Sequence, residues 1–279
     1  MGFRRPYAIG RGLGRCLAEQ YAASRTVARY ILNGKDNSRL PAWNCSGRGD
    51  SVKLTEIEIW RAFAKVNLEL RVLGKRSDGY HEIRTLLQTI DLHDEIRVSP
   101  AETFEFTASA GPGGESNLVV QAVRAFEEES SIKVSVRMEL MKRIPSGAGL
   151  GGGSADAAIT LLGLNRRLGA RIPGERLMGL MRDLGSDVPF FALGGRALAV
   201  GRGETLFPLH AEADYWLVLV NPGIPVNTTE AYSWLTESAR FNSMLSFCAR
   251  FVPPQGHARL ALETGPNDFE TPLFSRFPQ

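Results

Sequence analysis

A glycine-rich stretch over residues 145–155 constrains the fold of this 279-residue chain more than any other feature. Five glycines fall within positions 147–153, after an alternating apolar segment at 134–140 that is typical of a strand and before an Ala- and Leu-rich segment at 154–168 that is typical of a helix. Glycine adopts positive φ at little cost, so such a loop can turn its N–H groups inward, and the open helix end adds partial positive charge. The order strand, glycine loop, helix therefore predicts an anion site, with phosphate as the natural ligand.

Several known phosphate loops share part of this pattern. Gly147, Gly149 and Gly152 match the dinucleotide fingerprint, but the segment after the loop's helix predicts another helix in place of a strand with an acidic end. The P-loop pattern needs a lysine, which residues 147–158 lack. A protein-kinase loop lies between two strands and does not open a helix. A glycine-rich turn without a ligand is the remaining alternative, and the backbone entropy of five glycines disfavours it.

Composition indicates an ordinary globular protein, with 43% hydrophobic and 23% charged residues. No apolar run approaches the roughly 18 residues of a membrane span, so no membrane association is expected. The three cysteines, Cys16, Cys45 and Cys248, are widely spaced and odd in number. They favour a reducing compartment over a disulfide framework, so we expect a cytoplasmic location, or an organelle such as a plastid if residues 1–55 are a transit segment.

Positive charge is concentrated near the N-terminus. Residues 1–50 carry nine Lys and Arg against three acidic residues, whereas the rest of the chain is net negative despite the overall charge of +3. The body is therefore not expected to bind nucleic acid. We interpret residues 1–55 as a basic extension that is disordered or targeting, as translated sequence upstream of the domain, or as a small ordered appendage, with one helix at about 12–32.

The remaining chain predicts a mixture of strands and helices. Asp78-Gly79 lies between two alternating segments and is a strong hairpin signal, and 194–203 predicts a further hairpin. Strands are expected at 55–72, 81–90, 91–98, 103–107 and 134–140, with a short buried strand at 216–220. Helices are expected at 117–129, 154–168, 173–184 and 228–239.

The glycine-rich stretch Pro145-Ser-Gly-Ala-Gly-Leu-Gly-Gly-Gly-Ser-Ala155 resembles the second motif of the GHMP kinase superfamily. Further segments are similar to those of one of its families, the 4-diphosphocytidyl-2-C-methyl-D-erythritol kinases, and the Asp-Gly-Tyr-His block is the most specific of them. The resemblance covers about residues 56–279. The segments lie at 64–68, 73–82, 185–191, 201–204, 221–223 and 267–270.

The resemblance implies an α+β fold with two domains. Residues 56–212 would form a mixed α/β nucleotide-binding domain, and 213–279 a partial ferredoxin-like domain, incomplete because no second glycine loop follows Gly265. The implied activity is ATP-dependent phosphorylation of the 2-hydroxyl of the family's substrate in the non-mevalonate isoprenoid pathway. Two alternatives stay open, a nucleotide-binding protein without turnover because of the C-terminal truncation and a GHMP kinase of another alcohol.

The resemblance also implies roles for individual residues. Lys65 and Asp187 would be catalytic, although Asp187 could instead cap a helix and Lys65 could be a solvated charge on an edge strand. Asn67, Tyr80, His81 and Tyr232 would bind a small-molecule substrate that carries a cytidine diphosphate moiety. The ATP-binding residues would be Pro145, Ser146, Gly147, Ala148, Gly149, Leu150, Gly151, Gly152, Gly153, Ser154 and Ala155.

Metal binding by the protein itself is not expected, because His, Cys and carboxylates form no cluster at ligand spacing. Mg²⁺ would arrive with ATP and be held mainly by phosphate oxygens. The Ser154 hydroxyl is expected to cap the helix that follows the loop, or else to touch this ion. The chain is expected to be a monomer or a weak homodimer.

Overall fold

The computed structural model describes residues 56–170, 172–209, 216–224, 226, 228–235 and 266–278. The basic extension at 1–55, with its expected helix at 12–32, lies outside the described residues, as does the expected domain boundary at 212. The division into two domains therefore stays a prediction. Within the described part of the chain, no helix is long and apolar enough to cross a membrane.

A long antiparallel hairpin forms the centre of the sheet. Strand β1 (Glu58–Lys75) pairs with β2 (His81–Pro100) along almost its whole length. The turn between them is closed by a hydrogen bond of 2.8 Å from the Arg76 amide to the Tyr80 carbonyl, and Gly79 has a φ of +87° that glycine tolerates. The hairpin predicted at Asp78-Gly79 is confirmed, but the two strands expected at 81–90 and 91–98 are one continuous strand of 20 residues.

The other edge of β2 is shared by two strands. Strand β5 (Arg196–Gly201) pairs with residues 83–88 of β2, and β4 (Val136–Met141) pairs with residues 95–100. Residues 89–94 of β2 therefore pair with neither of them. Strand β6 (Thr205–Leu209) extends the sheet antiparallel to β5, and β3 (Glu105–Ala108) extends it parallel to β4. The hairpin predicted at 194–203 is present but extends further. Its turn lies at 202–204, and its two strands are β5 and β6.

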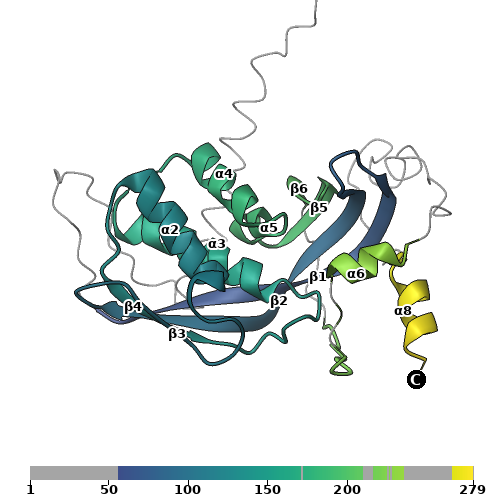
Figure 1. The fold of residues 1–279 in the computed structure, drawn as a ribbon, viewed down its shortest axis with the longest axis horizontal. Helices are drawn as coiled ribbons and strands as arrows, with labels where there is room; N and C mark the ends of the chain where they lie inside the picture. Colours follow the sequence, from purple (N-terminus) through teal and green to yellow (C-terminus); the bar gives the residue numbers. More distant parts are fainter. Residues whose placement is uncertain are drawn as a thin grey trace, which may run out of the picture.

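Four helices gather on one side of this sheet (Figure 1). They are α2 (Leu118–Ser130), α3 (Gly152–Arg167), α4 (Gly174–Leu184) and α5 (Val188–Leu193), with a short 3-10 turn η1 (Gly114–Ser116) before α2. The expected helices at 117–129, 154–168 and 173–184 are confirmed to within two residues at each end. Their apolar sides and the sheet bury the main core, whose largest fully buried side chains are Trp60, Phe126, Phe190, Leu87 and Ile96. Burial of this apolar surface stabilises the layered arrangement.

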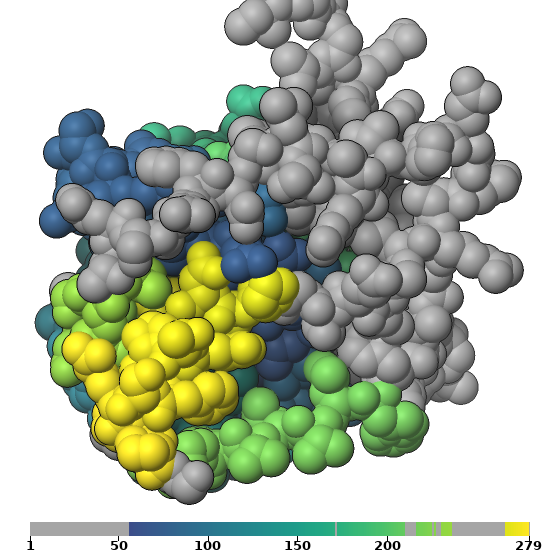
Figure 2. Space-filling model, turned by 90° about the vertical axis from the view of Figure 1, so that its right-hand side faces the viewer, coloured from purple at the N-terminus to yellow at the C-terminus, as the bar shows by residue number. Residues whose placement is uncertain are grey.

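Two short helices lie beside the far end of the β1–β2 hairpin. They are α6 (Thr228–Ser233) and α8 (Glu270–Arg276), which Figure 2 shows side by side in yellow-green and yellow. The Asp268 carboxylate joins this region to β1, because it accepts hydrogen bonds from the Val72 amide at 2.8 Å and the Arg71 guanidinium at 2.7 Å. A small apolar cluster supports the contact and consists of Leu70, Val72 and Ile83 packed against Tyr232, Leu235 and Phe269. The helix predicted at 228–239 is thus present from 228 to 233, and 236–239 lie outside the described residues.

The prediction of a buried strand at 216–220 is wrong. This apolar segment forms no regular secondary structure, and Trp216 and Val218 are 100% and 91% exposed. It runs along the surface as a separate green segment in Figure 2. A run of apolar residues predicts burial only if another element presents a face to pack against, and among the described residues no strand pairs with this segment.

Candidate active site

The glycine loop runs from the end of β4 to the start of α3, as the sequence predicts. Gly147, Gly149 and Gly151 have φ values of +72°, +71° and +71°, in the left-handed region. The tip of the loop is exposed, whereas Ile144 and Leu150 at its two ends are buried in a small cluster with Ala64. The loop therefore combines anchored ends with a tip that is accessible to a ligand.

The first turn of α3 has no side-chain cap. The helix begins at Gly152 with Gly151 as its N-cap, and no side chain accepts a hydrogen bond there. Ser154 thus lies inside the first turn, and the expectation that it caps the helix is wrong because the helix begins two residues earlier than predicted. Free N–H groups and the helix dipole at this end are the groups that bind an anion.

Gly151 is the point at which the loop meets the expected catalytic side chains. A Cβ at this position would lie 2.6 Å from the Phe191 ring and 3.3 Å from Cγ of Lys65, so a larger residue does not fit without movement. The preceding Leu150 carbonyl accepts a hydrogen bond of 3.0 Å from the Lys65 amide. The backbone of β1 at Lys65 is therefore joined directly to the end of the loop.

Lys65 and Asp187 form an ion pair beside the glycine loop. Their Nζ and Oδ2 atoms are 3.4 Å apart, and the side chains are 7% and 39% exposed. Lys65 is therefore not a solvated charge, and that alternative is excluded by its burial. Asp187 stands at the N-cap position of α5 but makes no capping hydrogen bond, so its carboxylate is available to Lys65 and to solvent.

Asn67 orients the Lys65 ammonium. Its Oδ1 accepts a hydrogen bond of 2.7 Å from Lys65 Nζ, and its Nδ2 donates to Thr85 Oγ1 at 2.7 Å. The Thr85 hydroxyl in turn donates to the Glu69 carbonyl at 2.6 Å. Because this hydroxyl donates to Glu69, its oxygen is the acceptor for the Asn67 amide, and the Asn67 oxygen faces Lys65. Sequence reasoning missed Thr85, since its link to Asn67 arises only from the pairing of β1 with β2.

The expected substrate aromatics lie together near Asp187. The His81 and Tyr232 rings are stacked with centroids 4.8 Å apart and an interplanar angle of 21°, and Phe269 meets Tyr232 edge-on at 5.0 Å. Burial raises the pKa of the Tyr232 hydroxyl to about 12, with a further contribution from the negative charge of Asp187. Burial and the charge of Lys75 lower the pKa of His81, which favours a neutral imidazole.

Tyr80 is exposed and lies under an arginine that sequence reasoning did not single out. The Arg202 guanidinium stands 4.6 Å from the centroid of the Tyr80 ring, a cation–π geometry. Arg202 belongs to the turn between β5 and β6, whose Gly203 lies beside Asp187, with 3.7 Å from its Cβ position to Asp187 Oδ1. The motif at 201–204 marked this turn, but nothing in it indicated that the arginine would face Tyr80.

No group of three or more His, Cys, Asp and Glu side chains within the described part of the chain could hold a metal ion. The loop and the first turn of α3 offer backbone N–H groups, which suit phosphate oxygens. The donors present therefore suit the phosphates of a nucleotide.

Known proteins resemble this chain in sequence. The model of the GHMP kinases N terminal domain matches residues 117–195, which include the glycine loop. The 4-diphosphocytidyl-2-C-methyl-D-erythritol kinase of Solibacter usitatus is 42% identical over 228 residues, which cover 78% of this chain and 71% of that enzyme. The enzyme of the same name from Geobacter metallireducens is 40% identical over 222 residues, covering 78% of this chain and 77% of its own.

A solved structure shares both the sequence similarity and the fold. A crystal structure of 4-(cytidine 5'-diphospho)-2C-methyl-D-erythritol kinase is 37% identical to this chain, with a TM-score of 0.61. The match covers 79% of this chain and 78% of that one. It therefore extends well beyond the glycine loop and its neighbouring helices.

Proposed function

The chain belongs to the 4-diphosphocytidyl-2-C-methyl-D-erythritol kinases, a family of small-molecule kinases in the GHMP superfamily, and we propose that it phosphorylates the 2-hydroxyl of 4-diphosphocytidyl-2-C-methyl-D-erythritol with ATP. The reaction is a step of the non-mevalonate isoprenoid pathway. The observation that carries the proposal is the pair of Lys65 and Asp187 at the end of the glycine loop. A buried cation beside an accessible carboxylate is what an acceptor hydroxyl needs next to a bound phosphate.

Residues 145–155 hold the phosphates of ATP in this proposal. The exposed loop tip and the uncapped first turn of α3 direct backbone N–H groups and the positive end of the helix dipole to one place. Bound ATP with its Mg²⁺ supplies the phosphoryl group and part of the charge neutralisation. Ser154 carries a hydroxyl in the first turn of α3, and we assign it contact with this ion.

Asp187 and Lys65 act on the acceptor hydroxyl. Asp187 accepts or orients its proton, and the Lys65 ammonium, paired with this carboxylate, stabilises negative charge on the acceptor oxygen. Asn67 holds the ammonium in place through its bond to Lys65 Nζ, so we assign it orientation of Lys65 in addition to contact with the substrate. Positioning of this kind is the main means by which phosphoryl transfer is accelerated.

The cytidine diphosphate moiety is assigned to the aromatic group near Asp187. His81 and Tyr232 present stacked rings, and Tyr80 presents an exposed ring under Arg202. Because the His81 and Tyr232 rings are in contact, a cytosine held between them requires Tyr232 to move away from His81. The guanidinium of Arg202 is placed to neutralise part of the charge of the diphosphate.

Substrate-dependent ADP release tests the proposal. The full chain is incubated with Mg²⁺-ATP and 4-diphosphocytidyl-2-C-methyl-D-erythritol, and in parallel with mevalonate or homoserine. We expect ADP only with the cytidyl substrate, and inhibition by CMP that competes with this substrate. ADP release with another alcohol would assign a different GHMP activity. ATP binding by folded protein without ADP release from any acceptor would contradict kinase activity altogether.

A further inference from the structure

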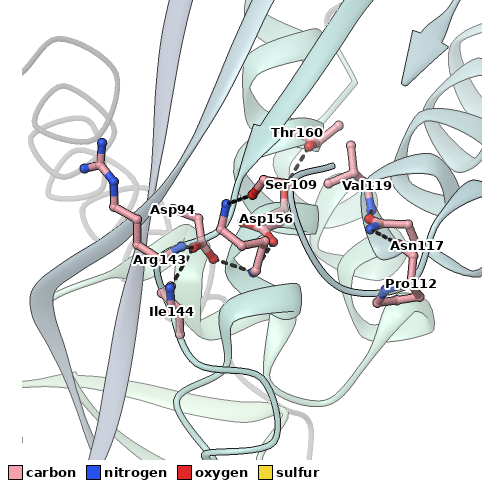
Figure 3. Close-up of polar contacts among 10 residues, drawn as sticks. Asp94, Ser109, Pro112, Asn117, Val119, Arg143, Ile144, Asp156 and Thr160 are labelled. Carbon is pink, nitrogen blue, oxygen red and sulfur yellow. Dashed lines mark hydrogen bonds and ion pairs between the residues drawn. The ribbon is translucent and has the colours of Figure 1, made fainter. Parts of the chain in front are cut away.

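A buried carboxylate holds the chain where β4 passes into the glycine loop. Asp94 on β2 is completely buried and stands just beyond the last pair of the β2–β4 ladder, Glu95 with Met141. Its Oδ1 accepts hydrogen bonds from the amides of Arg143 and Ile144, the second at 2.8 Å (Figure 3). Beyond the last β2–β4 pair, the Asp94 carboxylate thus accepts the backbone hydrogen bonds that a strand would otherwise accept. These bonds fix the direction in which the chain leaves β4 and enters the loop.

A lysine connects this carboxylate to the helix on the other side of the loop. Lys142 Nζ donates to Asp94 Oδ2 and, at 2.7 Å, to Oδ2 of Asp156, one turn inside α3. A Cβ on Gly152, the first residue of α3, would lie 3.1 Å from the same Nζ. The Lys142 ammonium, which comes from the start of the loop, thus contacts both β2 and the first turn of α3.

This group brings two carboxylates and one ammonium together with little exposure to water. Asp94 and Asp156 are buried, and Oδ1 of Asp156 finds no hydrogen-bond partner among the described residues. Burial raises the pKa of Asp156 to about 7, with Lys142 opposing the rise, and the two carboxylates raise the pKa of Lys142 against the effect of its burial. The lysine offsets the cost of holding two carboxylates close together in this position, since unpaired buried charges are strongly unfavourable.

We propose that Lys142, held between Asp94 and Asp156, is a positioning residue that fixes the start of the glycine loop against the first turn of α3 and so sets the geometry in which the phosphates of ATP are bound. The inference rests on the proposed function, because it takes ATP as the ligand of the loop. Lys142 is itself largely buried and acts through the loop backbone. Its charge matters because it holds Asp94 and Asp156 together.

The exposed neighbour Arg143 offers a matched control. Its guanidinium pairs with Glu95 at 3.0 Å on the surface, and Figure 3 shows its side chain directed away from Asp94 and Asp156. Lys142→Met and Arg143→Met each remove one positive charge from adjacent positions, but only the first disturbs the buried group. A general effect of charge near the loop would therefore appear in both variants.

The test compares the Michaelis constants of these variants for the two substrates. Lys142→Met is expected to raise KM for ATP roughly tenfold or more, since small displacements of positioning groups have effects of this size. KM for the cytidyl substrate should stay within about twofold, and Arg143→Met should change neither constant. Hydrogen exchange should become faster at the Ile144 amide in Lys142→Met, because Asp94 is no longer held in place.

A second variant keeps the test decisive if Lys142→Met does not fold. Asp156→Asn retains the contact between Lys142 and Asp94, so the same change in KM for ATP is expected with a smaller size. The proposal is overturned if Asp156→Asn and any folded Lys142→Met leave KM for ATP unchanged, if both Michaelis constants change equally, or if Arg143→Met has the same effect. If the wild-type chain has no kinase activity, equilibrium binding of a fluorescent ATP analogue to the same variants tests the role of Lys142 separately from the proposed function.

Discussion

The two sides of the candidate active site are built in different ways. On the phosphate side, the glycine loop connects neighbouring elements, β4 and α3. Asp94 accepts a hydrogen bond from the Ile144 amide at one end of the loop, and the Lys65 amide donates one to the Leu150 carbonyl at the other. On the substrate side, His81, Tyr232 and Phe269 come from separate parts of the chain and meet mainly through ring contacts. The ends of the glycine loop are therefore held by hydrogen bonds, whereas the rings of the substrate side touch one another by stacking and edge contacts, with Asp268 anchoring the segment that carries Phe269 to β1.

This difference matches the ligand proposed for each side, phosphate on one and a base on the other. Phosphate oxygens need N–H donors at fixed positions, and a small displacement weakens several bonds at once. A base that stacks on aromatic rings tolerates small shifts, because stacking depends on area more than on the direction of single bonds. Asp187 and Lys65 lie between the two sides, close to Gly151 and within electrostatic reach of Tyr232.

Asp187→Asn should have the largest effect, because it removes the group on which both sides converge. The amide keeps the shape of the side chain but cannot take the proton of the acceptor hydroxyl, so kcat should fall by about 10²–10⁴-fold. ATP affinity should change little, as measured by titration with a fluorescent nucleotide. If ATP affinity is lost together with kcat, Asp187 belongs to the fold of the phosphate side and the catalytic assignment is wrong.

Gly151→Ala should damage the phosphate side selectively. The new methyl group would meet the Phe191 ring at 2.6 Å and would stand on a backbone with a φ of +71°. We expect KM for ATP to rise by roughly tenfold to a hundredfold, with a loss of about 1–3 kcal/mol of unfolding free energy measured by denaturant titration.

Gly149→Ala is the matched control for this prediction. Its φ is also +71°, but a Cβ there meets nothing within 4 Å, so it carries only the backbone strain. Gly149→Ala should therefore cost less stability than Gly151→Ala, and Phe191→Leu in the Gly151→Ala background should restore part of the loss. Equal effects of the two alanines would show that steric contact with Phe191 is not what requires glycine at 151.

Tyr232→Leu should weaken the substrate side alone. Loss of an aromatic face is worth about 1–3 kcal/mol of base stacking, so KM for the cytidyl substrate should rise by roughly 5–150-fold while KM for ATP stays constant. Tyr232→Phe keeps the ring and should have only a small effect. If Tyr232→Phe is as harmful as Tyr232→Leu, the hydroxyl near Asp187 carries the function and the ring does not.

The smallest effect is expected from the protonation of His81. Its pKa is lowered from 6.5 by burial and by Lys75, so the neutral form of the stacked imidazole predominates at pH 6.5 and the ring takes up its proton mainly at lower pH. The unfolded chain takes up this proton more readily, and the contribution of His81 to stability is therefore lost as the pH falls below 6.5.

Kinetics across this range can detect the change. KM for the cytidyl substrate should be constant from pH 8 to about 6.5 and should rise a few-fold at lower pH, as the charged ring becomes harder to bury. NMR titration of the imidazole, assigned with His81→Gln, gives the pKa directly. A value above 6.5, or the same KM profile in His81→Gln, would show that this histidine does not titrate as its surroundings require.

The sequence alone determined the features that depend on local chemistry. The positions of Gly147–Gly151 and the Ala-rich segment behind them predict the loop and α3, because glycine permits positive φ and the helix pattern is periodic. Asp78-Gly79 predicts the hairpin turn for the same kind of reason. The family resemblance then selected Lys65 and Asp187, and in the structure Lys65 Nζ lies 3.4 Å from Asp187 Oδ2.

Only the tertiary structure decided which charges lose contact with water and which side chains meet. The pairing of β1 with β2 brings Thr85 to Asn67, and the end of the β2–β4 ladder brings Asp94 to the loop. The apolar run at 216–220 also shows that local sequence does not decide burial. Its composition predicted a buried strand, but among the described residues nothing buries it. Strand register and packing depend on residues far apart in the chain, whereas glycine conformation and helical periodicity are properties of neighbouring residues.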